Sequence, residues 1–121
     1  MTIYQRMAAI FIEAGIPGFL NEWQATDEYP AIPDKYCTYL MEREAEAMAA
    51  DDEPLVTRYT LWVDIYGKTD VSAEQRALIR ALRAGGFYIP YTRDLDNQRL
   101  SEYEYHRRMQ VHYYQYDLEE D

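Results

Sequence analysis

Residues 55–66 read LVTRYTLWVDIY and give the strongest structural signal in the chain. The apolar residues of this stretch fall mainly on odd positions, which are Leu55, Tyr59, Leu61, Val63 and Ile65. The even positions hold Arg58, Thr60, Trp62, Asp64 and Tyr66. Alternation with a period of two, rich in β-branched and aromatic residues, predicts a long strand with one buried face. One covered face is typical of an antiparallel sheet.

Two helices are predicted on either side of this strand. Apolar residues recur every three or four positions near the N-terminus, which predicts an amphipathic helix that begins after Thr2 and ends at Gly15. Ser72 and Gln75 have the spacing of a capping box and predict the start of a second helix. Gly85-Gly86 supplies the stop for that helix.

The remaining segments predict three further strands and one long loop. Residues 18–34 contain prolines and scattered aromatics and are expected to be a loop. Residues 36–41 predict a strand, which 42–53 continue as an extended hairpin arm. Residues 87–91 and 101–116 predict the last two strands. The expected fold is α+β, an antiparallel four-stranded sheet with two helices packed on one face, in the order α-β-β-α-β-β.

Composition indicates one folded domain, residues 1–121, with a strongly acidic surface. The chain has 121 residues, 48% of them hydrophobic, and a formal net charge of -10. Since affinity for phosphates comes mainly from Lys and Arg, we expect no specific nucleic-acid binding. Residues 117–121 predict a solvated acidic tail.

The sequence shows no sign of secretion or membrane insertion. No apolar run approaches the length of a membrane span, and the apolar segment after Arg6 is soon interrupted by Glu13. Cys37 is the single cysteine, so it is expected to be a reduced, packed thiol. The cytosol is the default compartment for such a chain.

The residues that could carry chemistry do not form a recognisable site. His106 and His112 lie six residues apart, about 20 Å along a strand, so they cannot chelate one metal ion and are expected to be surface or interface histidines. The densest acidic cluster lacks the spacing of a calcium loop; it consists of Glu42, Glu44, Glu46, Asp51, Asp52 and Glu53. Gly85-Gly86 ends a helix and therefore cannot cradle a phosphate. We expect no enzyme activity, no metal and no cofactor.

The even face of the central strand is the more suggestive feature. Outward-facing aromatic and Arg residues are enriched at protein interfaces, and this face carries Arg58, Trp62, Asp64 and Tyr66. These residues are candidates for a subunit interface. The alternative is that a further helix or the 18–34 loop covers them.

An ordered set of short segments resembles a known family. In chain order they are Thr38-Tyr39-Leu40, Ala50-Asp51-Asp52, Val63-Asp64-Ile65-Tyr66, Gly86-Phe87 and Glu102-Tyr103-Glu104-Tyr105. Over about residues 36–116 the chain resembles the small tail-completion or head–tail joining proteins of tailed phages and prophages, of the tail-terminator type. The hairpin arm departs from that pattern because it is richer in Glu and Ala than the usual polar hairpin.

The resemblance implies a structural virion protein at the head-proximal end of the tail, assembled in the host cytoplasm. Such a protein forms a ring, commonly a hexamer, that caps the tail tube protein and joins it to the neck or head-completion protein. It carries no catalytic residues. An acidic lumen would let DNA pass without sticking, and the candidates for lumen or partner contacts are Glu42, Glu44, Glu46, Asp51 and Asp52.

Two other functions stay open at this point. A head–tail adaptor or stopper on the neck side belongs to the same machinery. A small-ligand-binding α+β domain could use the tyrosine-lined sheet face as its pocket.

Overall fold

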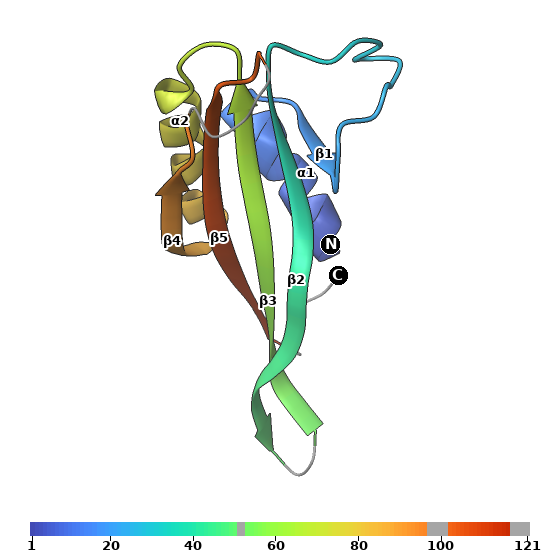
Figure 1. Cartoon of the computed structure of the whole chain (residues 1–121). Coiled ribbons are helices and arrows are strands. Elements are labelled where there is room, and N and C mark those ends of the chain that lie inside the picture. The colour runs from blue at the N-terminus through green and yellow to red at the C-terminus, as the bar shows by residue number, and fades with distance from the viewer. Residues whose placement is uncertain (51–52, 97–101, 117–121) are drawn as a thin grey trace.

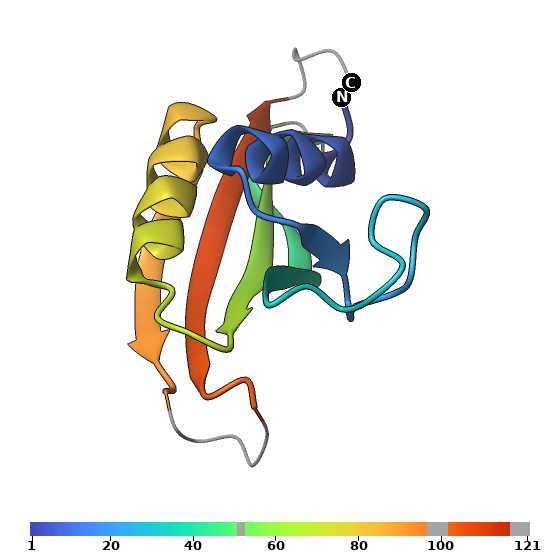
Figure 2. The same ribbon diagram turned by 90° about the horizontal axis from the view of Figure 1, so that it is seen from above.

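The structure is a computed structural model that describes residues 1–50, 53–96 and 102–116, with the backbone alone for 46–50 and 53–55. Its elements are α1 (Ile3–Ala14), β1 (Gly18–Leu20), β2 (Lys35–Ala50), β3 (Glu53–Gly67), α2 (Ser72–Ala84), β4 (Tyr88–Asp94) and β5 (Tyr105–Tyr116). Both helices lie on the same face of one sheet (Figure 1, Figure 2). The chain is therefore α+β, with β3 in the middle of the sheet.

The sheet has five strands in the order β1-β2-β3-β5-β4, and β1 runs parallel to β2. The prediction of a four-stranded antiparallel sheet was therefore wrong. Gly18–Leu20 is too short to show an alternating pattern, so it was included in the expected 18–34 loop. The strand forms because Gly15, in the left-handed region at φ 75°, ends α1 and turns the chain back towards the sheet. The backbone N–H of Cys37 then donates to the Pro17 carbonyl at 2.7 Å.

The odd positions of β3 face the helices. Leu61, Val63 and Ile65 are fully buried and pack in one cluster with Met7 and Leu82, which come from the two helices. The even positions of β3 point to the opposite face, which neither of the two helices in the described residues covers. We call this second face the open face. The alternation in 55–66 thus separates an apolar core from a polar and aromatic surface.

The two helices begin in different ways. In α1 the Thr2 hydroxyl accepts from the Gln5 backbone N–H and the Gln5 side chain accepts from the Thr2 N–H, so α1 has a complete capping box. In α2 the N-cap position is occupied by Val71, whose side chain makes no capping hydrogen bond. Asp70 instead accepts from both the backbone N–H and the hydroxyl of Ser72. The predicted capping box between Ser72 and Gln75 was therefore wrong.

The β2–β3 hairpin extends beyond the helices (Figure 1). Its antiparallel pairing continues to Ala50 opposite Glu53, which confirms an extended arm in spite of the local helix propensity of its Glu and Ala residues. The register shifts between Met41 and Arg43. This irregularity is a β-bulge, and it changes the face to which the following side chains point.

The close approach of α1 to β1 gives a stability prediction. A Cβ atom at Gly18 would overlap the ring of Phe11, which also contacts the Tyr39 ring at a centroid distance of 5.3 Å. We expect Gly18→Ala to lower the free energy of unfolding by about 1–3 kcal/mol, measured by urea denaturation. Phe11→Leu in the same chain should recover part of that loss, because the smaller side chain leaves room for the methyl group. An unchanged midpoint for Gly18→Ala would contradict the close contact.

Candidate functional site

The open face is organised around a buried carboxylate, Asp64, in the middle of β3. Asp64 is only 3% exposed. Its Oδ1 atom lies 2.7 Å from Nε2 of His106 and accepts from Nε of Arg108 at 2.9 Å. Both partners come from β5, where Arg108 is directly opposite Asp64 and His106 is opposite Tyr66. The period of two places all these side chains on the same face.

The partners of Asp64 decide its ionisation. Burial alone would raise the pKa of Asp64, but hydrogen bonds from His106 and Arg108, with their charges, outweigh burial and hold the pKa below its ordinary value. Asp64 is therefore an ion at neutral pH and tethers β3 to β5. The same interaction raises the pKa of Arg108, with the hydrogen bond to Asp64 as the main cause.

An aromatic stack covers one side of this centre. The Tyr66 ring stacks on His106 with a centroid distance of 4.4 Å and on Tyr36 at 5.2 Å. Tyr36 also meets Tyr103 edge to face, and the Tyr103 hydroxyl donates to the Pro33 carbonyl at 2.6 Å. Residues 101–116 were predicted as one strand, but β5 begins only at Tyr105, and Tyr103 lies before it in this second cluster. His106 was predicted to be a surface or interface histidine. It is only 8% exposed, so the prediction of a surface position was wrong.

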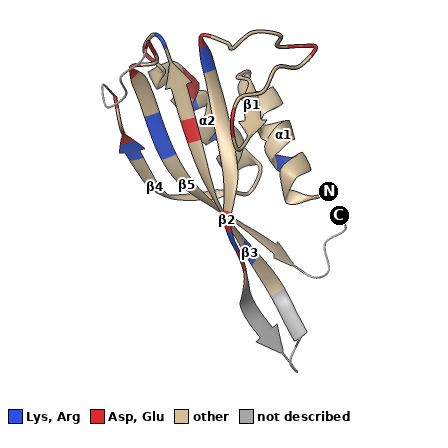
Figure 3. Cartoon of the chain, turned by 45° about the vertical axis from the view of Figure 1, so that its right-hand side comes forward, with Lys and Arg blue, Asp and Glu red and all other residues tan. Residues whose placement is uncertain are grey.

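The other side of the centre is more accessible. Trp62 is half-buried, between the Tyr91 ring, edge to face at 5.9 Å, and the Arg108 guanidinium at 5.1 Å from the ring centroid. Arg58 is also half-buried, and its Nε atom is enclosed without a hydrogen-bond partner in the described part of the chain. Burial, helped by the Arg58 charge, lowers the pKa of His112. β4 and β5 both carry basic residues, where their ribbons are blue in Figure 3.

The predicted interface residues therefore separate into two pairs. Asp64 and Tyr66 are held within the subunit by His106, Arg108 and the aromatic stack. Trp62 and Arg58 keep part of their surface exposed. The alternative prediction was that residues 18–34 cover this face. They do so near Tyr66, where Phe19 and Tyr29 join the aromatic cluster.

The acidic candidates on the hairpin do not share one face. Glu42 accepts from the Gln110 side chain at 3.2 Å on the open face. Glu44 is opposite Tyr59 and lines a hollow with the start of α1, on the helix-covered face. The bulge after Met41 causes this division. Glu46 lies in β2 opposite Thr57, its side chain outside the described part, and Asp51 and Asp52 lie outside the described residues altogether.

Two clusters of charged residues were not predicted from the sequence. The first joins Asp64 to His106 and Arg108, although a lone Asp inside an apolar strand predicts a buried polar partner. In the second, Arg107 donates to both carboxylate oxygens of Asp96 and to Gln75. This second cluster joins β5 to the turn after β4 and to α2, and no local spacing predicts it.

The described residues offer little for catalysis. No group of three or more His, Cys, Asp and Glu side chains within them could hold a metal ion. Cys37 is fully buried, and burial, with Asp64 nearby, raises the pKa of its thiol well above the ordinary value. A protonated, enclosed thiol is a poor nucleophile. The arrangement is suited to holding a sheet together and to presenting a surface.

The Asp64 centre gives a pH-dependent prediction. We expect Asp64→Asn to lower the free energy of unfolding at pH 7 by about 3 kcal/mol, because it leaves buried donors without a charged acceptor. The folded-state pKa of Asp64 lies below its ordinary value of 3.8, so the stabilising effect is present above that pH and is lost as the pH falls below it. The difference between parent and variant should therefore shrink in acid. Urea unfolding at several pH values measures this difference.

Asp27→Asn is the matched control for that experiment, since Asp27 is exposed. It should change stability by less than about 0.5 kcal/mol at any pH. A pH-independent loss in Asp64→Asn would show that the carboxylate is not ionised in the folded chain.

Similarity to known proteins does not identify this site. The chain matches no protein-family model, and no curated protein sequence matches it. Within the described residues, no helix has both the length and the apolar character needed to cross a membrane.

Proposed function

We propose that this protein is a structural ring subunit of the tail-terminator kind, which caps the tail tube of a phage or prophage and joins it to the neck. The proposal rests on the family resemblance in the sequence and is supported chiefly by one observation, the projecting β2–β3 hairpin. A protein that closes a tube and contacts its neighbours needs extended surfaces more than an enclosed cleft.

Among the described residues, no further strand lies beside the far end of the hairpin. β5 ends beside Val56, and β1 pairs with β2 only from Cys37 to Tyr39. The pairs Ala49–Pro54 and Ala50–Glu53 therefore belong to a two-stranded ribbon. An isolated two-stranded hairpin is at best marginally stable in water. Contact with another subunit or with the tube would supply the burial that this end of the hairpin lacks.

The charge of the hairpin suits a passage for DNA. Glu42, Glu44, Glu46, Asp51 and Asp52 occur within this hairpin segment of the sequence. A carboxylate-rich surface repels phosphates, so DNA would slide past it. The bulge after Met41 directs Glu42 and Glu44 to different faces, and for this reason we propose that only some of these carboxylates face the lumen while the rest contact a partner.

The accessible part of the open face is the proposed contact stripe. Trp62 and Arg58 remain from the expected interface, and Tyr91, 41% exposed, extends the stripe to β4. Trp, Tyr and Arg are the residues that most often dominate binding energy at protein interfaces. A ligand pocket on this face is less favoured, because Tyr36, Tyr66 and Tyr103 pack against one another.

Binding to isolated tail tubes tests the function directly. We expect the protein to co-sediment with tubes and to appear as a ring at their ends by negative-stain microscopy. Binding to DNA-filled heads instead of tubes would assign the protein to the neck as an adaptor or stopper. Failure to bind either, together with absence of rings in the presence of tubes, would overturn the proposal.

The contact stripe gives a prediction at the level of one residue. We expect Trp62→Ala to weaken assembly by at least about tenfold, because central aromatic anchors dominate interface energy. Native mass spectrometry over a concentration series, with and without tubes, measures the effect, and urea unfolding shows whether the subunit still folds.

Tyr4→Ala is the control, because Tyr4 is also exposed, at 42%, but belongs to α1, on the opposite face of the sheet from the stripe. It should assemble as the parent does. If Trp62→Ala unfolds the subunit, or if it folds and assembles normally, the stripe is not a subunit contact.

A further inference from the structure

The two lateral edges of the molecule carry opposite charges. β4 and β1 are the outermost strands of the sheet. α2 lies on the β4 side, whereas α1 and the segment between β1 and β2 lie on the other side (Figure 1, Figure 2). We call the first the arginine edge and the second the acidic edge, after the residues described next.

The arginine edge consists of Arg76, Arg80 and Arg83, all on α2. All of them are exposed, and they have no ion-pair partner in the described part of the chain. The spacing of the three arginines on α2 places them on neighbouring turns of the helix. Unpaired arginines on one helix stand out in a chain whose net charge is -10.

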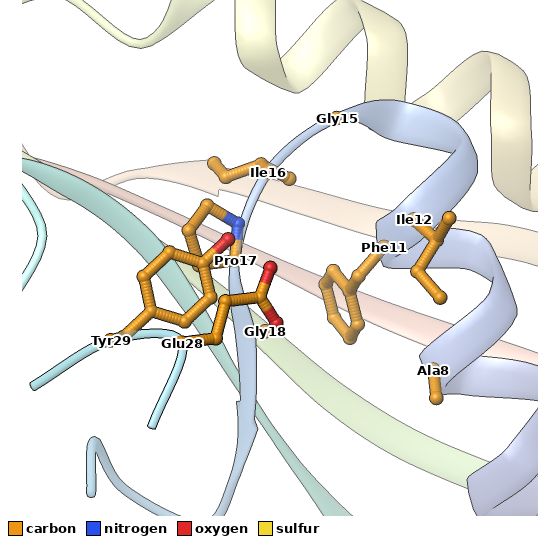
Figure 4. A pocket seen from close by; sticks show the side chains of 9 residues that line it. All are labelled: Ala8, Phe11, Ile12, Gly15, Ile16, Pro17, Gly18, Glu28 and Tyr29. Carbon is orange, nitrogen blue, oxygen red and sulfur yellow. The ribbon is translucent and has the colours of Figure 1, made fainter. Parts of the chain in front are cut away.

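The acidic edge carries Glu22, Asp27 and Glu28, which are exposed and likewise have no cationic partner among the described residues. Two hollows open there. One, of about 390 Å³, is lined by Phe11, Ile12, Ile16, Pro17, Tyr29 and the Glu28 carboxylate, among others (Figure 4). The other, of about 220 Å³, includes Phe19, Leu20 and Glu22 in its lining. Burial and the neighbouring Glu28 carboxylate raise the pKa of Tyr29, as expected where a negative charge is not neutralised.

Each hollow combines an apolar wall with one carboxylate. An arginine side chain matches this combination, because its aliphatic stem packs on apolar surface while its guanidinium binds a carboxylate through two parallel hydrogen bonds. Lysine would make the same charge contact with less geometric complementarity. The chain itself presents unpaired arginines at its opposite edge.

We propose that the arginine edge of one copy docks on the acidic edge of a second copy, with arginine side chains entering the hollows beside Glu22 and Glu28. Such a contact joins two different surfaces. A pair of subunits therefore still has one free arginine edge and one free acidic edge, and further copies can add to them until a ring closes. The inference rests on the proposed ring function and adds a second contact between subunits, distinct from the contact stripe of the open face. Charge complementarity would also orient the subunits and reject the reverse pairing.

Charge reversal tests this contact. We expect Arg76→Glu with Arg80→Glu in one variant, and Glu22→Arg with Glu28→Arg in another, each to weaken self-association at least about tenfold, because like charges then face each other. Sedimentation velocity at low salt measures the association. For the parent it should also weaken as salt rises to about 0.5 M, which screens exposed charges.

Mixing the two variants is the decisive arm of the experiment. In a mixture, the reversed arginine edge of one variant meets the reversed acidic edge of the other, so assembly should return. A single chain that carries all four substitutions should also assemble, with the same net charge as the parent. Glu104→Arg, at an exposed position outside both edges, is the control and should leave association unchanged.

The possible outcomes separate this contact from the proposed function. A parent that stays monomeric at every concentration and salt, or reversals that leave association unchanged, would overturn the edge-to-edge contact. If the protein nevertheless bound to tail tubes, only the edge-to-edge contact would be overturned and the proposed function would still be supported. Rescue on mixing without any binding to tubes would support the contact and overturn the tail-terminator role.

Discussion

β3 has to satisfy two different environments at once, and the rest of the structure depends on how it does so. Its odd side chains fill the core under both helices, so its even side chains face the side of the sheet on which the described residues place no helix. A carboxylate in the centre of that side cannot reach bulk water at 3% exposure. It must therefore find its partners across the strands, and β5 provides them in His106 and Arg108. One ionic centre thus fixes the pairing of the two central strands.

That solution leaves the open face unevenly occupied. Near Tyr66 the rings of three further aromatic residues and the loop after β1 complete a small second core. Near Trp62 and Arg58 no such cover exists in the described structure, and the surface continues without interruption to β4. The molecule is therefore closed at one end of the sheet and available for contacts at the other. The enclosed polar groups are engaged with one another, and the exposed end of this face is where the proposed contact stripe lies.

Periodicity predicted the parts of the fold that repeat. The alternation in 55–66, the spacing of the first helix and its Gly15 stop all concern neighbours in sequence, and the structure has them. The parallel strand β1 was missed because three residues carry no period. The Asp64 centre was missed for a different reason: its partners lie more than forty positions away, and only the pairing register brings them opposite. The capping of α2 shows a third limit, because Ser72 and Gln75 have the expected spacing but Asp70 takes the role.

The bulge after Met41 divides β2 into two functional parts. Before it, side chains that point inward meet the helices and cannot change without disturbing the core. Beyond it, the backbone ladder between β2 and β3 still supports the hairpin, although fewer neighbours constrain which side chains it presents. The shift between Met41 and Arg43 is the first of three in this ladder, and each shift turns the strand further from the register that serves the core. The hairpin can therefore leave the plane of the body without breaking the pairing that holds it.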